Sequence, residues 1–346
     1  MTTLPREAEW YLPTEVTVPV DGQWISAFEL AGRLAGTLHV ITAWDPGDLR
    51  LSREVNQARN VELRADIEAM GLNVLGALGS DPNSEHAEES WAVFGLTDEQ
   101  AIALGAKFDQ VAVFKITGSR QTVLGCVGDW KVSRGSGVPI GIADIAHWIN
   151  WPARRSHLQK LLDRYFVSPG YEGRHFEWFV SRIQPDRFTG EDLAAIGSLS
   201  VSIQASTARK LLEDPTGVLR ARLFDCRVEV SLHRQSPSLS WLWQEESAFN
   251  ALFEALNKNE FPGVGTVVSS KLMATKFPSL IPIRDRRVES LLDCAENFAW
   301  WEPLHGVLTA TESTLSQLNA TVDGAEVTAL RKLDVILWME ATDRDL

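Results

Sequence analysis

The chain has 346 residues, of which 45% are hydrophobic and 23% are charged. This composition is typical of a globular protein and excludes a disordered or fibrous one, and the length favours two domains over one. The formal net charge of −13 argues against a protein that binds nucleic acid through its overall charge.

The sequence shows no pattern typical of a membrane span, a signal peptide or a metal site. No run of about 18 apolar residues occurs, and the N-terminal MTTLPREAEW lacks the basic and then apolar pattern of a signal peptide. We therefore expect a cytoplasmic protein with no membrane partner. The seven histidines lack metal-ligand spacing, and the cysteines are far apart, so we expect no disulfide, metal site or cofactor. The cysteines are Cys126, Cys226 and Cys294.

Short apolar segments alternate with amphipathic ones in the first third of the chain, after an N-terminal extension at residues 1–35. Ser52 and Thr97 are expected N-caps of two helices, the first ending at Gly71 and the second near Phe108. Strands are expected at 38–44, 72–78, 91–96, 111–117 and 122–127. This order predicts a small α+β domain at 36–130 that resembles a ferredoxin-like sandwich.

Three polar residues share one face of the first expected helix. Asn56, Arg59 and Asn60 have i, i+3, i+4 spacing, which brings their side chains together. They are candidates for binding a small anionic ligand. The alternative is structural, with the three side chains capping strands or filling a polar edge.

Beyond a connector rich in glycine and proline at 131–154, the pattern predicts a mainly helical domain at 155–346. Helical spacing is clear at 157–166, after a capping signature that starts at Thr189, and at 247–258. The segment 222–232 contains the β-branched residues Val228 and Val230 and is compatible with either a short strand or an irregular entry into a helix. The fold class is therefore α+β, with a small α+β domain followed by a helical one.

The helical domain contains a glycine turn between two apolar-patterned segments. Gly263, Val264 and Gly265 separate a helix that ends near residue 258 from one in which Val264, Val268 and Leu272 recur at i, i+4, i+8. The glycine amides and the first amides of the second helix would face outward and attract a phosphate. A plain corner between helices, with glycine as C-cap, is the alternative.

Basic residues follow this turn. Residues 271–287 contain five of them against one acid, Asp285. They are candidates for contacts to DNA phosphates, and the alternative is a solvated charged surface. The five are Lys271, Lys276, Arg284, Arg286 and Arg287.

The turn and the aspartate together resemble the helix-hairpin-helix of the DNA glycosylase superfamily. That resemblance implies that Asp285 stabilises a cationic sugar, or activates water, while a base is released. The bifunctional members carry a lysine nucleophile where this chain has Val267, so the resemblance implies no lyase chemistry. An N-cap of the following helix is the structural alternative for Asp285, and its neighbours Arg284 and Arg286 could bind it in ion pairs.

Wider resemblances cover most of the chain. Residues of about 165–340 resemble the bacterial domain of unknown function 6308, through GRHF (173–176), DRFT (186–189), KL (271–272) and LRKLDVILWM (330–339). The first half resembles domain of unknown function 3293, through ITAWDP (41–46), ESW (89–91) and FDQVA (108–112). We expect a protein that binds DNA through the turn, with monofunctional base excision by Asp285. The alternative is a non-catalytic scaffold or regulatory module that binds a protein partner.

Overall fold

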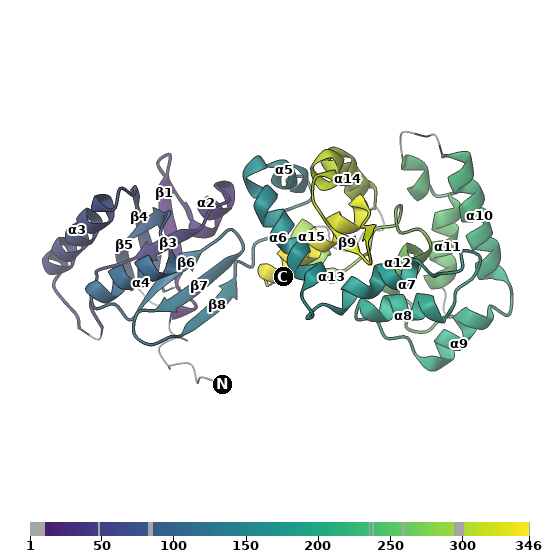
Figure 1. Ribbon diagram of the computed structural model, residues 1–346, viewed down its shortest axis with the longest axis horizontal. Helices are drawn as coiled ribbons and strands as arrows, with labels where there is room; N and C mark the ends of the chain where they lie inside the picture. Colours follow the sequence, from purple (N-terminus) through teal and green to yellow (C-terminus); the bar gives the residue numbers. More distant parts are fainter. Residues whose placement is uncertain are drawn as a thin grey trace. The chain divides into compact units, whose positions relative to one another are not determined.

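The computed structural model describes residues 11–47, 49–81, 86–234, 236, 239–257, 260–293 and 301–345. Cys294 lies outside these residues. The chain forms two compact units, one of Met1–Val138 with Asp343–Leu346 and the other of Pro139–Thr342 (Figure 1). No helix among the described residues has both the length and the apolar character that are needed to cross a lipid bilayer.

An eight-stranded antiparallel sheet forms the first unit, in the order β2-β1-β4-β5-β3-β6-β7-β8. Its four inner strands lie in the order β4-β5-β3-β6. Together with the helices α3 (Arg53–Ala69) and α4 (Asp98–Lys107) they follow each other along the chain as β-α-β-β-α-β, which is the ferredoxin-like arrangement. The α+β class expected from the sequence is therefore confirmed. The strands are β1 Glu15–Val20, β2 Gln23–Ser26, β3 Leu38–Ile41, β4 Val74–Ser80, β5 Ala87–Phe94, β6 Ala112–Ile116, β7 Arg120–Gly125 and β8 Lys131–Gly135.

Local capping explains where the two helices start. Ser52 accepts the Val55 N–H at the start of α3 (Arg53–Ala69), and Thr97 forms a reciprocal capping box with Gln100 at the start of α4 (Asp98–Lys107). Both helices bury their apolar residues against one face of the sheet. The short helix α2 (Ala27–Arg33) helps to cover a second apolar cluster that includes β1 and the other side of β3.

The sheet is larger than the sequence indicated. Residues 15–33, which were expected in an N-terminal extension, form β1, β2 and α2, and β1 pairs with β4 inside the sheet. A two-residue turn at Asp21 and Gly22, both with positive φ, joins β1 to β2. At the other edge of the sheet, β8 falls in the range 131–154 that was expected to be a connector, and this range also contains the helix α5 (Ile145–Asn150).

The second unit is mainly helical (Figure 1). Its helices are α5 Ile145–Asn150, α6 Arg155–Val167, α7 Phe176–Val180, α8 Gly190–Ser198, α9 Ala205–Glu213, α10 Val218–Leu232, α11 Ala248–Asn257, α12 Thr266–Lys276, α13 Arg286–Leu292, α14 Trp301–Ser316 and α15 Ala329–Asp343. A small hairpin of β9 (Thr321–Val322) and β10 (Ala325–Glu326) lies between α14 and α15. Helices far apart in sequence pack together, as α5 and α14 do.

The apolar patterns of this unit correspond to its buried surfaces. In α11 the residues at i, i+3, i+4 and i+7 are all buried, and they are Phe249, Leu252, Phe253 and Leu256. Thr189 and Asp192 form the expected capping box at the start of α8. The ambiguous segment 222–232 is part of the helix α10.

Candidate functional site

A tight turn precedes α12. The Val264 N–H donates to the Phe261 carbonyl at 3.0 Å, with Pro262 second in the turn and Gly263 third at a φ of 84°. A positive φ at the third position defines a type II turn and favours glycine there. Phe261 and Val264 are buried and anchor the turn, whereas Gly263 and Gly265 are exposed with open space around them.

The amides at the start of α12 have no side-chain acceptor from the N-cap, because that residue is Gly265. Backbone amides without a capping side chain, at the positive end of the dipole of an 11-residue helix, favour binding of an anion. The turn itself is fixed from below, since Thr207 Oγ1 donates to the Pro262 carbonyl at 2.9 Å. These contacts leave the outer surface of the turn accessible.

Asp285 is the N-cap of α13, and its Oδ1 accepts the Arg287 N–H at 3.0 Å. Its Oδ2 lies 3.4 Å from Lys271 Nζ, which also donates to the Leu199 carbonyl at 3.1 Å. Burial lowers the pKa of Lys271, and the nearby Asp285 opposes that shift. The half-buried carboxyl group thus has a contact on each oxygen, one from the backbone and one from a buried lysine.

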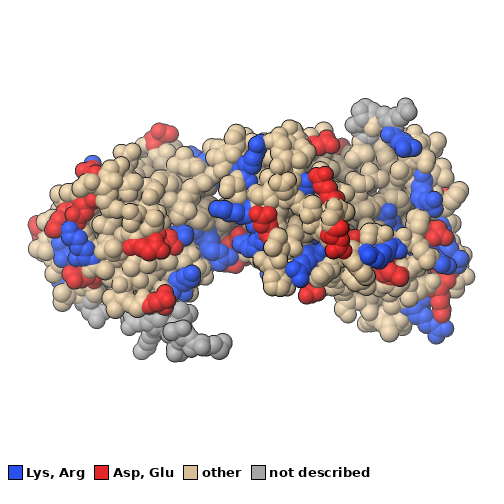
Figure 2. Space-filling model, in the orientation of Figure 1, with Lys and Arg blue, Asp and Glu red and all other residues tan. Residues whose placement is uncertain are grey.

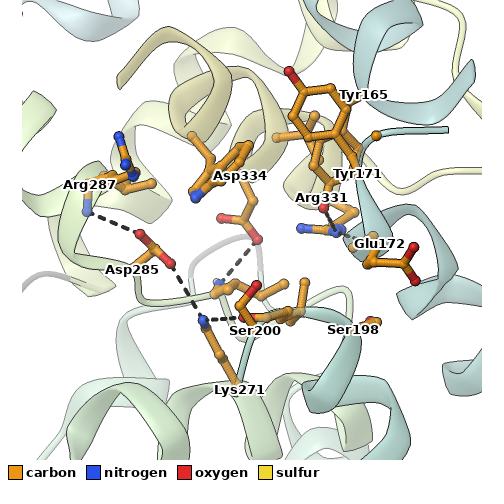
Figure 3. A pocket seen from close by; sticks show the side chains of 17 residues that line it. Tyr165, Tyr171, Glu172, Ser198, Ser200, Lys271, Asp285, Arg287, Arg331 and Asp334 are labelled. Atoms are coloured by element: carbon orange, nitrogen blue, oxygen red, sulfur yellow. Dashed lines mark hydrogen bonds and ion pairs between the residues drawn. The ribbon is translucent and has the colours of Figure 1, made fainter. Parts of the chain in front are cut away.

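Asp285 and Lys271 line a cavity of about 380 Å³ in the helical unit (Figure 3). Its aromatic lining comes from Tyr165 and Tyr171, stacked with ring centroids 5.5 Å apart, and from Trp338, which meets Tyr171 edge-on. A concave site with an apolar lining and a few convergent polar groups is the usual form of a ligand site. The other lining residues include Glu172, Ser198, Ser200, Ile283, Arg287, Val288, Arg331, Asp334 and Val335.

A buried arginine on α15 forms hydrogen bonds with several residues at the cavity. Arg331 donates to Glu177 Oε1 at 2.6 Å, to the Tyr165 hydroxyl at 3.0 Å and to the Gly173 carbonyl at 3.1 Å. Burial opposes its charge, but Tyr165 and Glu177 outweigh this and raise the pKa of Arg331. Tyr165, one of the aromatic lining residues, is therefore held in position by a hydrogen bond.

Asp334 lies one helical turn after Arg331 and is buried. Its Oδ2 accepts the Ile283 N–H at 3.1 Å, and its Oδ1 has no hydrogen-bond partner among the residues that the structure describes. Burial raises the pKa of Asp334 to about 7, although Arg331 opposes the shift. Burial thus favours the neutral form of this carboxyl group over the charged form, relative to an exposed aspartate.

The cavity lies in the part of the chain that a known family covers. The family of unknown function DUF6308 matches residues 158–341, more than half of the chain. The chain belongs to the DUF6308 family. The protein of unknown function family DUF3293 matches residues 41–113. Both resemblances expected from the sequence are confirmed, and no curated protein or solved structure matches the chain significantly.

Three of the five basic residues that were expected to contact DNA have buried side chains. The side chain of Lys276 is buried, with Nζ 2.6 Å from Asp192 Oδ2 and hydrogen-bonded to the carbonyls of Gln184 and Arg187. Lys271 is buried beside Asp285, and Arg284 is buried in an ion pair with Glu289. Their ammonium and guanidinium groups are engaged with other parts of the chain, so they do not form a phosphate-binding surface in this structure.

Arg286 and Arg287 are the exposed members of that basic set, in the first turn of α13. Basic and acidic side chains are interspersed over the helical unit on the face that Figure 2 shows. A continuous basic band is the usual electrostatic mark of a duplex-binding surface. Contacts between the helical unit and DNA phosphates would therefore depend on the glycine turn and on Arg286 and Arg287.

The polar residues Asn56, Arg59 and Asn60 of α3 are used within the first unit. Asn60 accepts the Ala43 N–H at 2.8 Å and donates to the Glu89 carbonyl at 2.7 Å. Asn56 exchanges hydrogen bonds with Asp45, and Arg59 donates to the carbonyls of Ala43 and Phe108. These bonds cap the end of β3 and its loop, as in the structural alternative.

Sequence reasoning missed Arg331 and Asp334. The segment LRKLDVILWM holds three charged residues in an otherwise apolar helix, and each of the three is buried in the structure. Buried charges in such a helix require partners, which is a signal that the sequence did carry. Among the residues that the structure describes, no group of three or more His, Cys, Asp and Glu side chains could hold a metal ion.

Proposed function

We propose that the DUF6308 domain binds DNA and hydrolyses the bond between a base and its sugar, as a monofunctional base-excision enzyme. The observation that supports this most is the position of Asp285. Its carboxyl group lies at a cavity with an aromatic lining, at the N-cap of α13, which is the second helix after the glycine turn. The cavity would take a base turned out of the duplex, and aromatic side chains are suited to contact its faces.

The chemistry assigned to Asp285 is electrostatic. As the glycosidic bond breaks, positive charge develops on the sugar, and a fixed carboxylate nearby stabilises it. The Arg287 N–H and the Lys271 ammonium orient that carboxylate from two sides. Valine at position 267 supplies no amine, so water is the attacking group in this proposal.

DNA contact in this proposal comes from the backbone of the exposed residues Gly263 and Gly265 at the turn before α12, and from Arg286 and Arg287. The Val264 N–H takes no part, because it donates to the Phe261 carbonyl. Arg287→Glu and Arg286→Glu should each weaken duplex affinity and reduce its salt dependence. Arg53→Glu on α3 is the matched control, because it makes the same charge change at an exposed side chain of the other unit. Equal losses in all three variants would show that only overall charge matters.

A second candidate is the non-catalytic module. The buried pairs Lys276 with Asp192 and Arg284 with Glu289 are what a purely structural role of these residues would require. A duplex panel separates the candidates, with mismatches, hypoxanthine, uracil and 7-methylguanine each tested for abasic product. If the protein neither binds duplex DNA at low salt nor forms an abasic product, the non-catalytic module is the candidate that remains.

A further inference from the structure

A second carboxyl group, that of Asp334, lines the cavity beside Asp285. In Figure 3 it is directed toward the space that Asp285 and Lys271 also face. We propose that Asp334 is the acid that protonates a neutral base as it leaves the sugar. This assignment rests on the proposed base-excision activity and names the class of base that needs the residue.

The hydrogen bonds of Asp334 decide where its proton is. Oδ2 accepts the Ile283 N–H, so in the neutral acid the proton is on Oδ1. Oδ1 is buried, and no described part of the chain gives it a hydrogen-bond partner. An unsatisfied buried polar atom at a cavity is unfavourable, and an acceptor atom of a bound base would satisfy it.

Charged groups on several elements surround this carboxyl group. Arg331 is on the same helix, and the residues that line the cavity or act on Asp334 electrostatically include Glu172, Glu177, Lys271, Asp285 and Arg287, with Tyr165 as a further titratable group. Burial is the largest influence and raises the pKa of Asp334 to about 7. A general acid is most effective when its pKa lies near the working pH.

The proposed step balances with water as the only co-reactant. The bond between C1′ and the base nitrogen breaks, and its electron pair goes to the base. The proton of Asp334 Oδ1 moves to an acceptor atom of the base, which leaves neutral, while Asp285 faces the charge on the sugar. Water then adds to C1′ and loses a proton to solvent, and Asp334 takes up a proton again.

A base that already carries a positive charge needs no such proton. 7-Methylguanine leaves its sugar as a neutral base without protonation, whereas hypoxanthine, adenine and uracil do not leave as readily unless they are protonated. The role of Asp334 therefore predicts a difference between these substrates. A purely structural role, in which Asp334 holds Ile283 and the segment leading to Asp285, predicts equal losses for all of them.

Single-turnover release from duplexes with each base tests this with wild type, Asp334→Asn and Asp334→Glu. Asparagine keeps an acceptor for the Ile283 N–H but cannot give up a proton. We expect Asp334→Asn to slow release of neutral bases about 100- to 10,000-fold and to leave 7-methylguanine release within about threefold. Asp334→Glu should restore part of the neutral-base activity, and the wild-type rate for neutral bases should fall above about pH 7.

Retained 7-methylguanine release also shows that Asp334→Asn is folded. Equal loss for charged and neutral bases, or no loss for either, would overturn the role of Asp334 while base excision itself stands. If wild type releases neutral bases and not 7-methylguanine, the pH dependence of neutral-base release is compared between wild type and Asp334→Asn. The same pH dependence in both proteins would overturn the role of Asp334 as the acid. If wild type releases no base, the proposed function fails and this role fails with it.

Discussion

Replacing Asp334 by asparagine should change how the stability of the helical unit depends on pH. The carboxyl group is buried, and its pKa is raised from 3.8 to about 7. Because the folded state then holds the proton more tightly than the unfolded state, this group lowers stability as pH rises from about 4 to about 7. Below this range it costs nothing, and above it the full cost is present.

The size of the effect follows from the shift. Three pKa units correspond to roughly 4 kcal/mol, which is an upper limit for the cost of ionising Asp334 in the folded protein. Asparagine keeps the volume and the acceptor for Ile283 but has no charge to bury. Relative to wild type, Asp334→Asn should therefore gain up to roughly 4 kcal/mol between pH 4 and pH 8, on the order of 10 °C in Tm.

Urea and thermal unfolding at pH 4, 5, 6, 7 and 8 measure this difference directly. Other carboxyl groups titrate in the same range, but they are common to both proteins and cancel in the comparison. Stability curves of wild type and Asp334→Asn that run parallel from pH 4 to pH 8 would refute the raised pKa. Parallel curves would also contradict the proposal that Asp334 is a neutral acid at the cavity.

Three further outcomes are expected. Lys276→Met should destabilise the fold by about 3–5 kcal/mol in urea unfolding, because it leaves Asp192 charged and buried without its partner, and it should leave DNA affinity unchanged; weaker DNA binding without lost stability would contradict the burial. Asn60→Ala should cost about 1–3 kcal/mol, because it leaves the Ala43 N–H unpaired and leaves the Glu89 carbonyl with the Thr42 hydroxyl as its remaining side-chain donor, and an unchanged unfolding curve would refute the role of Asn60 in the fold. Borohydride should trap no covalent adduct with DNA, because the lysine nearest Asp285, Lys271, is held by that carboxyl group and the Leu199 carbonyl; an adduct that Lys271→Met abolishes would make this lysine the nucleophile.

Much of the fold could be predicted because its signals are local. Thr97 and Thr189 cap helices as their sequences indicate, and the order of elements between 38 and 125 follows from hydrophobic patterning. The first hairpin was missed although Asp21-Gly22 between alternating apolar residues is a strong hairpin signal. Segment 222–232 was ambiguous because its β-branched residues are compatible with both a strand and a helix. In the structure it is helical and packs against α11.

The site depends on partners that local sequence does not reveal. Asp285 was found from its spacing to the glycine turn, and it lines a cavity. The number of cations near it was misleading, because Lys276 pairs with Asp192, 84 residues earlier in the chain. Asp334 became a candidate only when the fold brought α15 to Ile283, 51 residues away in sequence. Long-range pairing of this kind decides whether a charged residue is a surface contact or part of the interior.

The most direct test is single-turnover base release by wild type and Asp285→Asn at saturating enzyme, with the Kd for the same duplex measured in parallel. Asparagine can still accept the Arg287 N–H, so the cap and the fold should persist. We predict an abasic product with wild type and a loss of about 100-fold or more with Asp285→Asn, at a Kd within about threefold of wild type. Equal release by the two proteins, or none by wild type across the panel, would contradict a catalytic Asp285.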